Sequence, residues 1–497
     1  MGENSTSDFD DRGGSTLEES PPRDSETNES PAGKSEVTRE SKGIRESLST
    51  IFSWRNYTVY LLTAWVYNGF AIIYEFFNLY LRALDWDYVL IGTVVTIIVA
   101  LSAASRLVGG YVGDVVDRKR LSALAMLMLA MYHLIMGVTT DFIFIFGALV
   151  IYATMDLAKG GSTAYIMENI PKEHSGLALS LFQTGRSWGI LTLAAFGLML
   201  PIFDFPVSMR LIYLVSGVFL LVCALARAVL LSPSPQKGRA KDRPLWRDFV
   251  AENRQAVKLI LSYMPAVMAI VVLDAISDSL WRYGALIYTN EELEFTIPSI
   301  AVMVLIPLII SLPLLIKVGR FSDVKGMKKT TLLVYSIMPI CAGLLFMAQH
   351  IEYWVPVSIV DAADSIVGGL ELVFTTPFLA IVIKAINDSL WALVLMTLIQ
   401  KSMPSTDTAK VLGIFWTVVY VVTSPGYFVG GLIFEFMGPA NMFIIIMIVN
   451  LLILGGIAKY GFRSKEPETL TERIGVLEST VDQLKREIED FRTRRKL

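Results

Sequence analysis

Charged residues stand inside long apolar stretches of this chain, at spacings that place them on shared helix faces. Asp274, Asp278 and Arg282 follow one another at i, i+4 and i+8. Residues three and four apart are neighbours on a helix surface, so two carboxylates and one guanidinium are expected on one face. Two acid–base pairs have the same kind of spacing: Asp156 with Lys159, and Lys384 with Asp388.

Two more charges have no partner of opposite sign within their own stretch. Glu75 is flanked on its own face by Asn68 and Asn78, and Arg186 stands beside Gln183. Ionisable residues in apolar helices are costly, and they usually face a cavity or each other. Arg186 is therefore expected to pair across helices with Glu75 or an aspartate, or to bind a substrate anion.

Crowded carboxylates in a low dielectric bind protons more tightly and can exchange them near neutral pH. Glu75 has no base on its own helix, and Asp274 and Asp278 outnumber Arg282. These three acids are therefore candidates for proton coupling, and all nine charged residues are candidates for binding a solute. For the two self-paired sets, a purely structural bridge within one helix is an equally open interpretation.

Aromatic residues accompany two of these charge sites. Trp281 and Trp391 are candidates to line the same cavity, together with the amides Asn68, Asn78 and Gln183. Arg106 lies one turn before Gly110, near the predicted cytoplasmic edge of its apolar stretch. It is expected to extend to lipid phosphate, as long basic side chains do at membrane surfaces.

The composition requires a membrane. Of 497 residues, 54% are hydrophobic and 18% are charged, which leaves more apolar surface than a soluble protein of this size can bury. Runs of about twenty apolar residues have the length of a membrane-spanning helix. The predicted spans are 57–81, 88–112, 121–139, 141–168, 176–201, 206–231, 258–289, 297–318, 330–348, 379–402, 409–436 and 439–461.

The distribution of basic residues predicts the topology. Lysine and arginine gather in alternate loops, at 118–120, 237–247 and 325–329, and in both flanking tails. Such loops remain cytoplasmic. Twelve spans with both termini in the cytoplasm of a plasma-membrane protein are therefore expected. Residues 350–378 carry Asp361, Asp364 and Glu371 and would break this rule as a span, so they are expected outside, as an interfacial or re-entrant element.

One loop motif occurs twice. GYVGDVVDRKR at 110–120 returns as GRFSDVKGMKK at 319–329, each time after an apolar stretch. Repeats of this kind indicate a duplicated membrane protein. The shared residues are Gly110, Asp114, Arg118 and Lys119 in the first copy, and Gly319, Asp323, Gly326 and Lys328 in the second.

Twelve spans with this motif after the second and the eighth resemble the major facilitator superfamily over residues 55–462. The resemblance implies an all-α membrane fold of two pseudo-symmetric six-helix bundles, 47–231 and 257–462. It also implies a central cavity lined by spans 1, 4, 7 and 10, where four of the charge sites fall, and a motif that latches the halves together. Val115 and Val324 replace the motif's usual arginine, so the latch would depend on aspartate–helix contacts.

The remaining segments are expected in the cytoplasm. Residues 1–46 have the composition of a disordered tail, and 232–256 form a central loop ending in a short surface helix or a solvated linker. The tail 463–497 has a heptad seam typical of a parallel two-stranded coiled coil, which would make a homodimer. A single helix lying on the membrane or on the protein is the alternative. The seam residues are Leu470, Ile474, Leu477, Val481, Leu484 and Ile488.

These features together predict a secondary transporter that moves a small polar or charged solute by alternating access with proton coupling, as symport or antiport. A uniporter without ion coupling is one alternative, and a membrane sensor signalling through its coiled coil is another. No phosphate-binding loop or metal-spaced His/Cys cluster occurs, and the chain has only three histidines. An enzyme, a cofactor, a metal site and nucleic-acid binding are therefore not expected.

Overall fold

The computed structural model describes residues 52–168, 184–233, 265–402 and 408–460, with isolated positions between and before these ranges. All four ranges belong to one compact unit, Ile51–Leu497. The regular elements of the described residues are helices. A single isolated β-bridge also occurs there, between Tyr353 and Thr375. The predicted tail 1–46, most of the central loop 232–256 and the coiled coil 463–497 lie outside the described residues.

The N-half, residues 52–233, begins with a span made of three pieces. The helix α2 (Arg55–Phe70) continues through the 3-10 helix η1 (Ala71–Phe76) into α3 (Phe77–Arg82). Acidic caps start the next long helices, as Asp87 accepts the Leu90 amide at 2.6 Å. The other elements are α4 (Tyr88–Val115), α5 (Arg118–Val138), α6 (Phe142–Thr154), α7 (Asp156–Glu168), η3 (Thr184–Trp188), α9 (Gly189–Met199) and α10 (Phe205–Leu230).

The C-half, residues 265–460, repeats the pattern of long apolar helices. Gly326, one of the motif glycines, separates two of them with a φ of 81°, a conformation that favours glycine. The elements are α12 (Pro265–Glu291), α13 (Ile297–Lys325), α14 (Met327–Tyr335), α15 (Ile337–Met347), α16 (Val357–Ile366), η4 (Leu370–Phe374), α17 (Thr376–Ser402), α18 (Thr408–Phe436) and α19 (Pro439–Tyr460).

Eight stretches among the described residues are long and apolar enough to cross a membrane. They are Tyr88–Gly109, Arg118–Val138, Phe142–Ser162, Phe205–Leu230, Met327–Met347, Thr376–Ile399, Ile414–Phe436 and Pro439–Lys459. Each coincides with a predicted span. The other four predicted spans are also largely helical, but 57–81 is interrupted by η1 and 176–201 begins outside the described residues. The α12 helix carries four charged residues, and α13 has a shorter apolar part, Ile297–Ser311. Twelve spans therefore stay a prediction.

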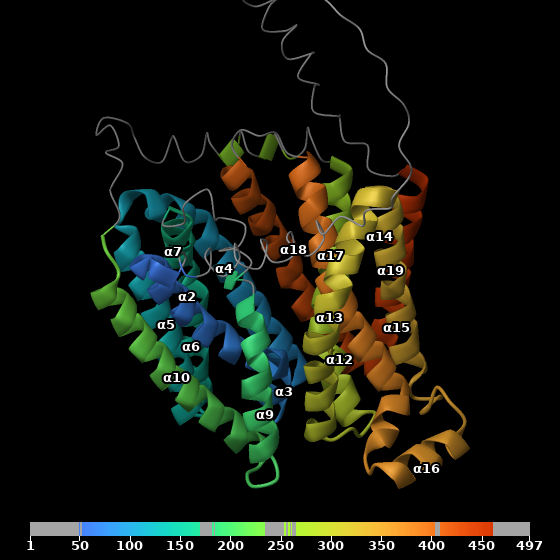
Figure 1. Cartoon of the computed structure of the whole chain (residues 1–497). Helices are drawn as coiled ribbons and strands as arrows, with labels where there is room; N and C mark the ends of the chain where they lie inside the picture. Colours follow the sequence, from blue (N-terminus) through green and yellow to red (C-terminus); the bar gives the residue numbers. More distant parts are fainter. Residues whose placement is uncertain are drawn as a thin grey trace, which may run out of the picture. The chain divides into compact units, whose positions relative to one another are not determined.

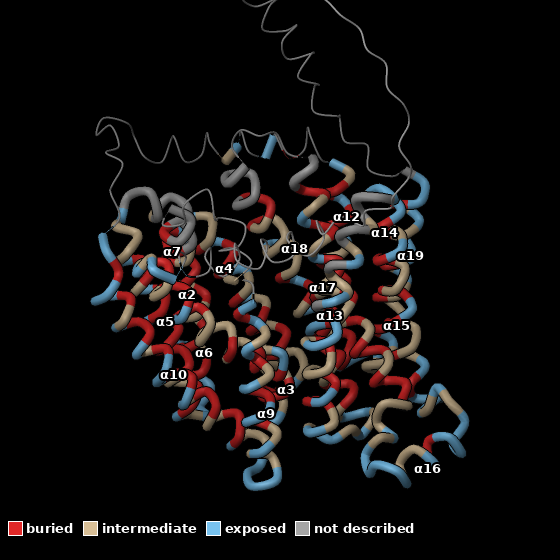
Figure 2. The backbone as a smooth tube through the Cα atoms, viewed as in Figure 1, coloured by how far each residue is buried: buried red, intermediate tan, exposed pale blue. Residues whose placement is uncertain are grey.

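Residues 350–378 form a small appendage between α15 and α17. Its ten-residue helix α16 is too short to cross a bilayer. The base is closed by the Tyr353–Thr375 bridge and by the Thr376 amide, which donates to the Glu352 carbonyl at 2.8 Å. Figures 1 and 2 show α16 beyond the ends of α15 and α17, and largely exposed. Its place outside the membrane stays a prediction.

The two halves meet along α4 and α18, which lie side by side near the middle of Figure 1. Gly92 of α4 packs on α18 so closely that a Cβ there would lie 2.5 Å from the Tyr427 carbonyl oxygen. Gly431 of α18 packs on α4 in the same way, 2.6 Å from the Tyr88 carbonyl oxygen. One turn beyond Gly92, the Thr96 hydroxyl donates to the Ser424 carbonyl of α18 at 2.7 Å. We call this contact the α4–α18 seam.

Candidate functional site

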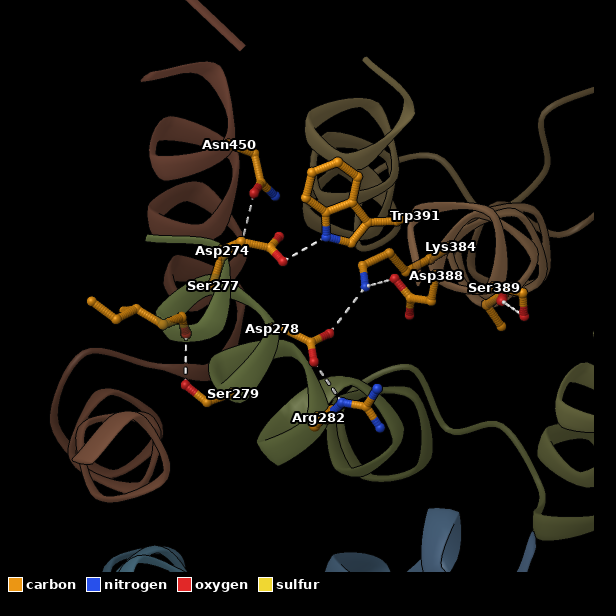
Figure 3. A network of polar contacts seen from close by, with 12 residues as sticks. Asp274, Ser277, Asp278, Ser279, Arg282, Lys384, Asp388, Ser389, Trp391 and Asn450 are labelled. Atoms are coloured by element: carbon orange, nitrogen blue, oxygen red, sulfur yellow. Dashed lines mark hydrogen bonds and ion pairs between the residues drawn. The ribbon is translucent and has the colours of Figure 1, made fainter. Parts of the chain in front are cut away.

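The acidic face predicted on α12 meets the acid–base pair of α17 in one polar network (Figure 3). Asp278 receives the Arg282 guanidinium at 2.6 Å and the Lys384 ammonium at 3.4 Å. Lys384 also contacts Asp388 at 2.5 Å, and its side chain is only 4% exposed. Asp278 and Asp388 therefore share the buried Lys384 ammonium, and the more exposed Arg282 guanidinium pairs with Asp278.

Asp274 lies one turn away and is held differently. Its two oxygens accept hydrogen bonds from the Trp391 indole at 2.7 Å and from the Tyr335 hydroxyl at 2.8 Å. That hydroxyl also lies 2.9 Å from the Asn450 amide oxygen, to which Ser277 donates. In the described part of the chain, Asp274 forms no ion pair. Both of its hydrogen bonds come from neutral donors.

The two predicted tryptophans both lie against charges. Trp391 donates to Asp274, and the Lys384 ammonium lies 5.2 Å from the centre of the Trp281 ring, within the range of a cation–π interaction. Both rings are more than nine-tenths buried. They hold the charged groups in place; whether they also touch a solute stays a prediction.

In the N-half, Asp156 at the start of α7 joins two basic residues. Arg106 of α4 contacts it at 3.0 Å, and Lys159 lies 3.9 Å from its other oxygen. The guanidinium of Arg106 also lies 4.1 Å from the ring centre of Tyr420 on α18. The prediction that Arg106 extends to lipid phosphate is therefore wrong. Gly109 explains why: it brings α4 onto the backbone of Asp156, so Arg106 lies over that carboxylate.

Glu75 and Arg186 form a long ion pair, at 3.8 Å, and both side chains are more than a third exposed. Glu75 lies in the 3-10 segment η1 and Arg186 in the 3-10 segment η3. The predicted neighbours separate: Asn68 packs beside Gly185 of η3, whereas Asn78 donates to the carbonyls of Arg282 and Tyr283 in the C-half. Gln183 lies outside the described residues.

A further cluster joins the halves at the ends of α3 and α12. The guanidinium of Arg82 donates to Glu291 at 2.7 Å, and the Tyr88 hydroxyl donates to the other Glu291 oxygen at 2.5 Å. Arg82 also lies 4.2 Å from the ring centre of Tyr88. Under the predicted topology this end faces outside, so we call Arg82, Tyr88 and Glu291 the outer latch.

Sequence reasoning missed two buried groups of the N-half. The Arg227 guanidinium, with 3% of the residue exposed, donates to Thr63 and Ser122 and lies 4.0 Å from the ring centre of Tyr60. The buried His133 ring lies 3.2 Å from the Tyr74 hydroxyl. Their partners are hydroxyl groups, which leave no charge pattern in a sequence.

The repeated motif lies where two helices end and the next begin. Gly110 and Asp114 are in the last turns of α4, and Arg118 and Lys119 open α5. Gly319 and Asp323 end α13, and Lys328 opens α14. The side chains of both motif aspartates lie outside the described part, so the latch role of the motif stays a prediction. Among the described residues, no group of three or more His, Cys, Asp and Glu could hold a metal ion.

A sequence model of the Major Facilitator Superfamily matches residues 47–389, more than half of the chain. The chain belongs to this superfamily. A search of curated proteins returned no significant match. As a superfamily member the chain is a multi-pass membrane protein of a transporter family, which points away from an enzyme.

Solved structures share the superfamily fold at low identity. The nucleoside transporter NupG is 12% identical, with a TM-score of 0.59 over 81% of this chain and 98% of its own. A D-xylose–proton symporter is 14% identical, with a TM-score of 0.58 over 84% and 99%. A POT family transporter in complex with 5-aminolevulinic acid is 13% identical, with a TM-score of 0.56 over 82% and 95%. At such identities the likeness extends to the fold alone.

Proposed function

We propose that this chain is a secondary transporter of the plasma membrane that moves a small polar or charged solute by alternating access, coupled to protons. The charges inside its helices support a polar cargo, because ionisable groups at this depth are expensive unless they serve binding or coupling. Five acids and five bases from α4, η1, α7, η3, α12 and α17 meet in the clusters described above.

The observation that carries proton coupling is the contrast between two neighbouring carboxylates. Asp278 is neutralised by Arg282 and Lys384. Asp274, one turn away, has only the neutral donors Trp391 and Tyr335. Binding a proton at Asp278 would break two ion pairs, whereas at Asp274 it breaks none, so Asp274 is the proton site we favour. The D-xylose–proton symporter indicates that the same fold is compatible with proton coupling.

Alternating access is supported by contacts of two kinds between the halves. The α4–α18 seam is close-packed backbone to backbone, which suits a lasting contact. The outer latch instead consists of polar side chains, each more than a quarter exposed in its ion pair, which can separate at modest cost. A transporter needs both, a fixed line of contact and a gate that opens.

The same proposal extends to the parts that the structure does not describe. Both termini would be cytoplasmic, with 1–46 and 463–497 as tails and 232–256 as the loop between bundles 47–231 and 257–462. The heptad seam of 463–497 would join two copies. Two alternatives remain, a uniporter without coupling and a non-transporting sensor that signals through this coil.

Full-length protein in proteoliposomes separates these possibilities. A panel of labelled solutes is first tested for thermal stabilisation, because a ligand that binds only the folded state raises its melting temperature. Solutes that stabilise are then tested for accumulation driven by a pH gradient. The Asp274→Asn variant should lose accumulation and keep solute exchange, and Asp361→Asn, on exposed α16, is the matched control.

Each alternative has its own outcome. Accumulation that survives in Asp274→Asn contradicts coupling through this residue. Exchange without accumulation in the wild-type protein indicates a uniporter. Binding without exchange or accumulation indicates a sensor.

A further inference from the structure

Two N-half spans leave α-helical geometry at the residues that form the long, exposed ion pair of Glu75 with Arg186. Glu75 lies in η1, whose sequence AIIYEF contains neither glycine nor proline, and Arg186 lies in η3. The two segments are held together locally, because Gly185 packs on Asn68 and Thr192 donates to the Gly69 carbonyl at 2.8 Å. Short 3-10 stretches within helices often mark functional sites, and transporters bind solutes where helices are interrupted.

The ion pair between these two segments is long and exposed to solvent. The shortest Arg186–Glu75 distance is 3.8 Å, too long for a hydrogen bond, whereas Arg106, Arg282 and Lys384 reach their carboxylates at 2.5–3.0 Å. The Arg186 side chain is 69% exposed and that of Glu75 is 38% exposed. Arg186 therefore keeps nearly all of its donors available.

A second guanidinium approaches from the C-half. Arg282 uses its Nε for Asp278, and its two Nη groups have no hydrogen-bond partner among the described residues. Its side chain is 48% exposed. Asn78, one turn beyond Glu75, donates to the Arg282 carbonyl at 3.1 Å, and the Glu75 charge acts on the Arg282 guanidinium. Tyr427 of α18 lies close enough to Glu75 and Arg282 for both of their charges to act on its hydroxyl group.

We propose that the transported solute is an organic carboxylate, and that its carboxylate binds between Arg186 and Arg282 in place of Glu75. A guanidinium is planar, and its paired N–H groups match the two oxygens of a carboxylate. Glu75 occupies this position as the chain's own carboxylate, at a distance too long to compete strongly. This inference rests on the proposed transport function and specifies its cargo.

A cationic solute finds a poorer site in the same place. Asp278 and Asp388 are taken by Lys384 and Arg282, and Asp274 accepts hydrogen bonds from Trp391 and Tyr335. Glu75 is the loosely held acid beside the two arginines. The guanidinium N–H groups of Arg186 and Arg282 that lack a hydrogen-bond partner among the described residues outnumber the oxygens of Glu75. This excess of donors favours an anionic solute. The Tyr427 hydroxyl supplies a further neutral donor close by.

The charge preference can be measured without knowing the solute. A Tyr427→Cys variant places a thiol where the charges of Arg282 and Glu75 act on it, while Cys223 and Cys341 are buried and stay unmodified. Methanethiosulfonate reagents that carry a sulfonate or a trimethylammonium group are compared in the full-length protein. The sulfonate-to-ammonium rate ratio should exceed that of a small free thiol by about tenfold. Arg186→Gln and Arg282→Gln should each lower the ratio, and Glu75→Gln should raise it.

Arg210→Gln is the control, because Arg210 donates to the carbonyls of Gly137 and Val138, away from these clusters. Benzoate should slow labelling of the thiol more than benzamide does. A ratio equal to that of the free thiol, or one that the arginine variants do not change, overturns the inference.

Transport assays distinguish an error in the inferred class of solute from an error in the proposed transport function. Proteoliposomes are loaded with benzoate, succinate and their uncharged amides, and with D-xylose. Exchange of a carboxylate that Arg186→Gln abolishes supports the inference. Exchange of the uncharged solutes alone overturns it and leaves the chain a transporter. Solutes that bind but are never exchanged contradict the proposed function itself.

Discussion

Removing the charge of Glu291 should open the end of the molecule closed by the outer latch. Glu291 accepts from Arg82 at 2.7 Å and from the Tyr88 hydroxyl at 2.5 Å, so one acid of the C-half holds two residues of the N-half. The Glu291→Gln substitution keeps the shape of the side chain. It removes the ion pair and leaves two ordinary hydrogen bonds at best.

The expected size follows from the exposure of the pair. Arg82 and Glu291 are 29% and 26% exposed, so the ion pair is worth roughly 0.5–1 kcal/mol after screening by solvent. Loss of the charge-assisted bond from Tyr88 adds about 1 kcal/mol. A total of about 1.5–2 kcal/mol shifts the equilibrium between closed and open outer ends by roughly 10- to 30-fold.

Spin labels report this shift as a distance. Ile202, after α9, and Ile366, in α16, are 72% and 80% exposed, so cysteines there can be labelled without disturbing the core. Double electron–electron resonance should show a longer-distance population that grows in Glu291→Gln. The neighbouring acid supplies the control, since Glu292 is exposed and has no ion pair in the described part of the chain. Identical distance distributions in Glu291→Gln and the wild-type protein would refute the latch.

Two further predictions concern packing. Gly92→Ala should force α4 and α18 apart at the α4–α18 seam, at a cost of about 1–3 kcal/mol, and should reduce solute exchange. The control is Gly147→Ala, which has open space around its Cβ position and should change neither the melting temperature nor solute exchange. Arg227→Met should lower the melting temperature because the buried Thr63 hydroxyl loses the donor that it has in the described part of the chain, and Arg227→Lys should lower it less. Equal melting temperatures for Arg227→Met and the wild type would contradict this.

Contacts within one helix were predictable from spacing. The i, i+4 rule gave Asp278 with Arg282 and Lys384 with Asp388, which lie 2.6 and 2.5 Å apart. The apolar runs likewise predicted each of the eight stretches suited to a membrane. Both results depend only on the helical period and on bilayer thickness, which act locally.

Contacts between helices required the fold. Nothing in the sequence places Lys384 of α17 beside Asp278 of α12, or Tyr335 of α14 beside Asp274. The pairing of Arg186 with Glu75 was one of several open possibilities. The break at η1 also had no sequence signal, since the segment contains no helix-breaking residue and its geometry is set by what packs on it.

The α4–α18 seam constrains how the halves can move. Two helices that touch through backbone atoms cannot slide past each other without a clash. The halves are therefore expected to rotate about the α4–α18 seam as about a hinge axis. Points on a rotating body travel in proportion to their distance from the axis. The contact between α9 and α13, which also joins the halves, would then sweep through the larger arc, while Thr96 and its partners on α18 stay nearly still. Substitutions that slightly change the side chains along this axis would therefore alter the rate of the transport cycle without changing any contact to the solute.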